Sequence, residues 1–102
     1  MTQATTPTFT LTLPSTIDLG DAEHVVFTIE QNGYVLSKDE TSGVSVSSNV
    51  ATIELSQSDT VNFTGEMKAR IQLNWTYIDG SRGATKIKEV DIYENLYKDV
   101  IE

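Results

Sequence analysis

The chain has 102 residues and a formal net charge of −8, from 15 acidic and 7 basic side chains. Nucleic acids and anionic membranes attract Lys and Arg, so this charge disfavours both as partners. There is no cysteine, which excludes disulfides, zinc knuckles and thiol nucleophiles. No apolar run approaches the roughly 18 residues of a membrane-spanning helix, and the first residues lack the basic and apolar regions of a secretory signal.

The start of the chain combines a polar stretch with a strand pattern. Residues 1–7 are polar and rich in threonine, which predicts a flexible N-terminal arm. We expect residues 8–93 to form a single domain. Its first segment, residues 8–13, alternates threonine with Phe or Leu, as a half-buried strand does. Pro14 ends this strand, because proline has no N–H to donate to a ladder.

A hairpin is predicted next. Residues 24–31 alternate apolar and polar side chains, and residues 34–36 resume the same pattern. Asn32 and Gly33 lie between them, and this pair favours a type I′ turn, in which both central residues have positive φ.

The middle of the chain contains two short predicted strands and one interruption. The strands cover residues 44–47 and 50–55, with a turn at Ser48-Asn49. The alternation then stops over residues 56–63. Ser56 or Ser58 is suited to cap a single helical turn there. We expect this segment to cross from one sheet to the other.

The clearest element is residues 66–77, a long strand with one apolar face and one polar face. A glycine-rich hairpin loop follows at residues 79–83, and residues 84–93 return antiparallel. The apolar positions Ile87 and Val90 are out of phase with each other, which predicts a β-bulge near Lys88-Glu89.

The last segment, residues 94–102, changes to helical spacing and predicts either a short helix or an arm that docks on a partner. Together these elements predict an all-β fold, an immunoglobulin-like antiparallel β-sandwich of about seven strands with a short helical turn near 56–63. The single Trp75, on the apolar face of the long strand, suits such a core. A barrel remains an alternative.

Residues suited to chemistry are sparse. His24 is the only histidine, and although Asp21 and Glu23 are near it in sequence, no nucleophile motif accompanies them. The acidic groups at residues 18–23 and at Asp39-Glu40 match no calcium-loop spacing. We therefore predict a protein that is not an enzyme, without catalytic, cofactor-binding or metal-binding residues.

A polar stripe on the long strand has two interpretations. Lys68 and Arg70, with Lys86 and Lys88 on the neighbouring strand, form either a basic docking patch or cross-strand pairs with residues such as Glu66 and Glu89.

A family resemblance rests on a series of segments in order. These are residues 8–14 (TFTLTLP), 17–19 (IDL), 25–29 (VVFTI), 32–33 (NG), 55–63 (LSQSDTVNF), 70–75 (RIQLNW), 79–80 (DG) and 94–101 (ENLYKDVI). The series resembles small hypothetical structural proteins of tailed phages and prophages of low-GC Gram-positive bacteria. More distantly, it resembles the N-terminal domain of phage upper baseplate proteins.

The resemblance implies a tail- or baseplate-associated structural or assembly protein. Such a protein acts through contacts with other phage structural proteins or with copies of itself, in the virion or the host bacterial cytoplasm. The resemblance carries over no site residues.

An alternative is a β-sandwich module that binds carbohydrate or a cell surface. Such a module needs outward-facing aromatic side chains, and the candidates are Tyr34, Trp75, Tyr77, Tyr93 and Tyr97.

Overall fold

The computed structural model describes residues 1–98. In chain order its elements are β1 (Thr8–Thr12), the 3-10 turn η1 (Leu19–Asp21), β2 (His24–Gln31), β3 (Tyr34–Asp39), β4 (Val44–Ser47), β5 (Val50–Glu54), α1 (Gln57–Thr60), β6 (Met67–Thr76), β7 (Arg82–Ala84) and β8 (Lys88–Ile92). No helix in this part of the chain is long and apolar enough to cross a membrane.

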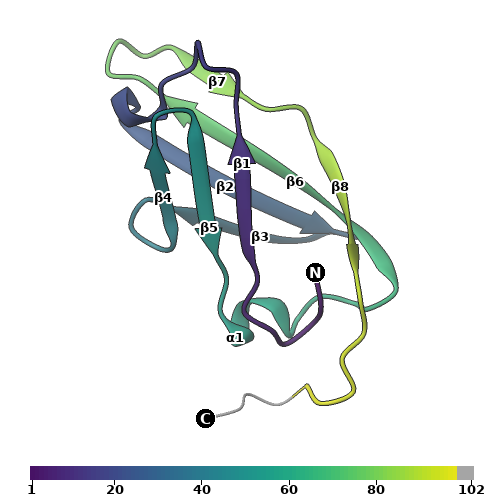
Figure 1. Ribbon diagram of the computed structural model, residues 1–102. Helices are drawn as coiled ribbons and strands as arrows, with labels where there is room; N and C mark the ends of the chain where they lie inside the picture. Colours follow the sequence, from purple (N-terminus) through teal and green to yellow (C-terminus); the bar gives the residue numbers. More distant parts are fainter. Residues whose placement is uncertain (99–102) are drawn as a thin grey trace.

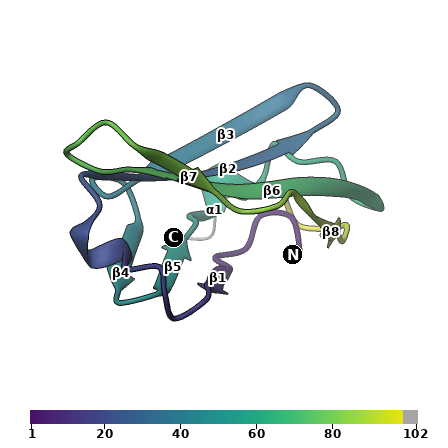
Figure 2. The same ribbon diagram turned by 90° about the horizontal axis from the view of Figure 1, so that it is seen from above.

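The strands form two antiparallel sheets that pack as layers (Figures 1 and 2). The smaller sheet has the order β1-β5-β4. In the larger sheet, β3-β2-β6 continues into β7 and then β8, which both pair with β6. The predicted all-β antiparallel sandwich is confirmed. Its strand order places β2 and β3 side by side in one sheet, whereas the second and third strands of an immunoglobulin constant domain lie in different sheets.

The core lies between the layers and follows from the alternation of β2 and β6. Phe27 and Leu73 face each other across the two strands, and both are fully buried. Trp75 lies two residues further along β6 and is also buried. From the smaller sheet, Ile53 completes the contact between the layers. Period-two burial of this kind is what an antiparallel sheet with one wet face produces.

The predicted turns are present. Asn32 and Gly33 have φ values of 48° and 89°, as the hairpin between β2 and β3 requires. Between β5 and β6, Ser56 accepts a hydrogen bond from the backbone N–H of Asp59, and the Asp59 carboxylate accepts one from the backbone N–H of Ser56. This capping box starts the single helical turn α1.

The extra residue predicted near Lys88-Glu89 is present but lies earlier. Between the pairs Ile71↔Lys88 and Asn74↔Ala84, β6 contributes two residues and the returning chain contributes three, residues 85–87. Thr85 bridges the gap, since its N–H donates to the Leu73 carbonyl and its hydroxyl accepts from the Leu73 N–H. The predicted position was wrong because a threonine hydroxyl replaces a backbone carbonyl at this point in the ladder.

Residues 1–7, predicted to be a flexible arm, are packed against the sandwich. The N–H of Tyr93 donates to the Met1 carbonyl at 2.7 Å, and the N–H of Gln3 donates to the Tyr93 carbonyl at 3.0 Å. The Gln3 side chain is buried and donates to the carbonyl of Phe63. The start of the chain therefore forms a short parallel bridge beside the end of β8.

The predicted helix or arm at residues 94–102 is described only in part. Residues 94–98 form neither helix nor strand, and residues 99–102 lie outside the described residues. Asn95 is tied to the N-terminal segment, because its amide donates to the Gln3 carbonyl at 2.9 Å. Leu96, by contrast, is 96% exposed.

Candidate interaction groove

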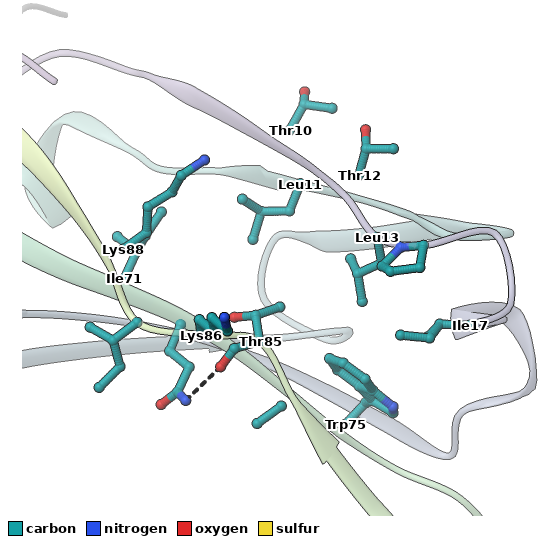
Figure 3. A pocket seen from close by; sticks show the side chains of 14 residues that line it. Thr10, Leu11, Thr12, Leu13, Ile17, Ile71, Trp75, Thr85, Lys86 and Lys88 are labelled. Carbon is teal, nitrogen blue, oxygen red and sulfur yellow. Dashed lines mark hydrogen bonds between the residues drawn. The ribbon is translucent and has the colours of Figure 1, made fainter.

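A groove of about 650 Å³ opens along one side of the sandwich, between β1 and the β7–β8 chain. Its apolar walls are Leu11, Leu13 and Ile17 from β1 and the loop after it, and Ile71, Trp75 and Ile87 from β6 and the segment between β7 and β8. Leu11 and Leu13 point into it, whereas Thr10 and Thr12 point away (Figure 3). We call this the edge groove.

The edge groove exists because both bordering strands are at the edges of their sheets. β1 ends the order β1-β5-β4, and β7 and β8 end the larger sheet. The inward side chains of β1, Phe9 and Leu11, are consequently only half-buried. Across the groove, the irregular residues 85–87 leave Ile87 53% exposed. Apolar side chains next to the core are therefore partly exposed to solvent in the edge groove.

Two lysines border the edge groove. Lys88 takes the same side of β8 as the half-buried Val90 and the buried Ile92, so alternation directs it inward at the mouth of the groove. Lys86 lies beside it in the irregular segment, and both are exposed. Within residues 1–98, neither lysine forms an ion pair. In a chain of net charge −8, they make the groove mouth locally positive.

The outer edge of β8 also has free backbone groups. The N–H and carbonyl of Tyr93 and the carbonyl of Asp91 point outward from the sheet. They form hydrogen bonds with Met1 and Gln3. In an antiparallel ladder every second residue points the same way, so Glu89 also directs its backbone groups outward. Ile87 lies just before the start of β8. Among the described residues, no segment pairs with them.

The position of Trp75 depends on Gly83, its partner on β7. A Cβ on Gly83 would lie 2.4 Å from an atom of the Trp75 ring. The glycine therefore lets the indole lie flat on the strand and form part of the groove wall.

The basic stripe on the outer face of β6 is neutralised by carboxylates. Lys68 pairs with Asp91 at 2.9 Å, and Arg70 pairs with Glu30 at 3.3 Å. The hydrogen bond that Lys68 donates to Asp91 raises the pKa of Lys68. Of the two interpretations of the polar stripe, cross-strand ion pairing applies to Lys68 and Arg70. Their partners are Asp91 and Glu30, whereas the sequence had suggested Glu66 and Glu89. Of the four basic residues in the predicted patch, Lys86 and Lys88 form no ion pair within residues 1–98, and they lie at the edge groove.

His24 forms an exposed ion pair rather than a catalytic site. Its Nδ1 lies 2.6 Å from Glu40 Oε1, and Glu40 Oε2 accepts from the Val25 N–H. The hydrogen bond to Glu40 raises the pKa of His24, and that from His24 lowers the pKa of Glu40. No serine or threonine hydroxyl is among the partners of this imidazole within residues 1–98.

The acidic residues singled out in the sequence order local turns. Asp18 accepts from the N–H of Gly20, and Asp39 accepts from Thr41 and Ser42. The hydrogen bonds from Thr41 lower the pKa of Asp39. No group of three or more His, Asp or Glu side chains in residues 1–98 is placed to hold a metal ion.

The candidate aromatic residues do not form a platform. Trp75 is buried, and Tyr34 and Tyr77 are half-buried against the core. Tyr93 and Tyr97 are exposed at 52% and 58%. The edge groove was not predictable from local sequence patterns, because its walls come from segments roughly 60–75 residues apart in the chain. The one available signal was the phase change at Ile87.

No protein-family model, no curated protein and no solved structure matches the chain. The edge groove and its lysines are thus the basis on which a function is proposed.

Proposed function

We propose that this chain is a non-enzymatic structural or assembly protein of a tailed phage or prophage particle, associated with the tail or baseplate. It acts through contacts with other particle proteins and with copies of itself. The edge groove is the observation that carries this proposal. It combines half-buried apolar side chains, free strand edges and two unpaired lysines, the features by which sheets recruit further protein segments. The phage setting comes from the sequence resemblance.

The burial of Trp75 favours this function over binding of a carbohydrate. A sugar platform needs a flat aromatic ring open to solvent, and Trp75 is only 6% exposed. Its ring contributes to the wall of a groove whose other apolar side chains are aliphatic. Aliphatic walls are suited to side chains of a protein partner.

The proposal is tested in particles from a host that carries the gene. Quantitative mass spectrometry of purified particles should find this chain at a fixed number of copies per particle. A photo-crosslinking residue in place of Ile87, in the groove wall, should attach to another particle protein or to a second copy. The same residue in place of Ile78, which is 90% exposed outside the groove, is the matched control. Absence of the chain from particles and from their assembly intermediates would overturn the proposal.

A further inference from the structure

We propose that the edge groove of one copy binds the segment that begins at Glu94 in a second copy, as an added β-strand. This inference rests on the proposed function, because it names one partner of the groove. Three observations point to this occupant: the free edge of β8, the apolar walls of the groove, and the complementary charges of the lysines and the segment.

The edge of β8 already accepts an extended segment in the structure. Met1 and Gln3 pair with Asp91 and Tyr93 as a short parallel ladder. The next outward groups along the same edge, those of Glu89, and the backbone of Ile87 just before β8 form no backbone hydrogen bond to another segment within the described chain. A strand added there continues an existing ladder, and its inward side chains enter the groove.

The segment after Tyr93 has apolar side chains that are suited to fill the apolar groove. Leu96 and Tyr97 are exposed at 96% and 58%, and the sequence continues with Val100 and Ile101. Residues 96–101 in extended form span about 20 Å, which exceeds the roughly 17 Å of the five residues 84–88. The segment is long enough to follow the whole open edge.

The charges of the segment and the groove are complementary. Residues 94–102 contain Glu94, Asp99 and Glu102 against the single Lys98. The groove offers Lys86 and Lys88 without ion partners among residues 1–98. Opposite charges at a groove mouth fix the register of a bound strand and accelerate its association.

The donor and the groove belong to different copies. Asn95 is held by Gln3 near α1, and Figure 1 shows the chain leaving the sandwich at that end. The edge groove lies toward the opposite end, beside β7 and the end of β1 (Figure 1). Reciprocal exchange between two copies closes a dimer, and head-to-tail exchange closes a ring.

The experiment uses two full-length variants that each lose one half of the contact. Leu96→Asp removes an apolar anchor from the donor and leaves the groove intact. Lys86→Glu with Lys88→Glu reverses the groove charge and leaves the donor intact. We expect the unaltered chain to be oligomeric by light scattering behind a sizing column. Each variant alone should raise the dissociation constant at least tenfold, and an equimolar mixture should form a one-to-one heterodimer.

Matched controls separate the contact from general surface effects. Ile78→Asp introduces the same charge at another exposed apolar residue, and Arg82→Glu reverses an exposed cation outside the groove that forms no ion pair within residues 1–98. Neither control should change the mass of the oligomer. A peptide of residues 94–102 should dissociate the oligomer and change the emission of Trp75, the single tryptophan, in the groove wall.

Two outcomes would overturn the inference. One is an unaltered chain that stays monomeric while the peptide leaves Trp75 emission unchanged. The other is an oligomer that both variants leave intact. Either result leaves the particle experiment to decide the proposed function by itself, because a groove that rejects its own chain is still open to another particle protein.

Discussion

At the scale of single residues, Trp75 and Gly83 connect the core with the edge groove. The indole covers the position where any other residue at 83 would carry its Cβ, at 2.4 Å from the ring. Contacts this short require the ring or the strand to move. The glycine is therefore a packing requirement of the groove wall.

We expect Gly83→Ala to reduce the free energy of unfolding by about 1–3 kcal/mol, the usual cost of overpacking. It should also shift the emission of Trp75, because the ring is displaced toward solvent. Denaturant unfolding followed by fluorescence measures both effects. Ala84→Ser, at the exposed neighbouring position, is the control and should leave stability and emission nearly unchanged. Equal effects of the two substitutions would contradict the packing role.

The pair His24–Glu40 makes stability depend on pH. The pKa of His24 is raised above 6.5 by Glu40, with smaller contributions from Glu23 and Asp39. Its contribution is therefore fully present below pH 6.5 and is lost as the pH rises through the folded-state pKa. The pKa of Glu40 is lowered below 4.5, so its contribution is present above pH 4.5 and is lost as the pH falls through the folded-state value.

We expect the Tm difference between the unaltered chain and Glu40→Gln to be largest between about pH 4.5 and 6.5, and to shrink at pH 8. An NMR titration of the single histidine should give a midpoint above 6.5 that moves down in Glu40→Gln. A midpoint that does not change would show that the 2.6 Å contact has no energetic weight in solution.

The residues that sequence reasoning missed are mostly buried glutamines. Gln31 follows the apolar alternation of β2, yet its side chain accepts from the Thr64 N–H and donates to the Thr64 carbonyl, both at 2.7 Å. Gln3 bonds in a similar way to Phe63 and Asn95. An amide side chain mimics a backbone peptide, so its burial depends on a distant loop that local patterns do not reveal.

At the scale of elements, α1 ties the N-terminal segment to the crossover between the sheets. Thr60 is fully buried, and its hydroxyl accepts from the Thr5 N–H and donates to the Thr5 carbonyl, at 3.0 and 2.8 Å. The turn itself was predictable from Ser56, because a capping residue acts locally. Its contact with Thr5, 55 residues earlier, was not.

Thr60→Val should destabilise the protein by about 1–3 kcal/mol, because it leaves the partly buried N–H and carbonyl of Thr5 without their hydroxyl partner. Ser56→Ala, which removes only the cap, should cost about 1 kcal/mol. Thermal unfolding of both variants gives the comparison. A Thr60→Val variant as stable as the unaltered chain would mean that the hydrogen bonds between Thr60 and Thr5 do not contribute to stability.

The strand that returns after β6, residues 84–93, was only partly predictable from its apolar pattern. Its phase change predicted an extra residue, and the ladder contains one. The location depends on Thr85, whose hydroxyl accepts the bond from Leu73. A side-chain hydroxyl that replaces a backbone carbonyl in the ladder does not change the apolar pattern. The bulge was therefore predicted a few residues too far toward the C-terminus.

At the scale of the whole molecule, the two layers were predictable and the open side was not. Alternation along each strand gives one buried face, and eight such strands must pack face to face. Which strands become edges is decided by pairings between distant segments, such as β1 with β5. The edge groove is a product of those pairings.

Hydrogen exchange should distinguish the covered from the open part of the β8 edge. In dilute solution, the amide of Tyr93 should be protected by its bond to Met1, whereas the amide of Ile87 should exchange rapidly. If the donor segment occupies the groove, protection of Ile87 should rise with protein concentration. Rapid exchange at both amides in dilute solution would instead indicate that residues 1–7 form the flexible arm expected from composition.

The inward-facing Lys88 also determines which contacts the open side rejects. Free strand edges beside an apolar groove are a common starting point for aggregation, and lysines on such edges act as gatekeepers against it. Two copies that approached edge to edge would bring Lys86 and Lys88 of each against the same residues of the other. Indiscriminate stacking of sheets is thereby penalised by charge repulsion. An acidic strand meets no such penalty, so the same two side chains that oppose edge-to-edge stacking would favour the acidic donor segment proposed above.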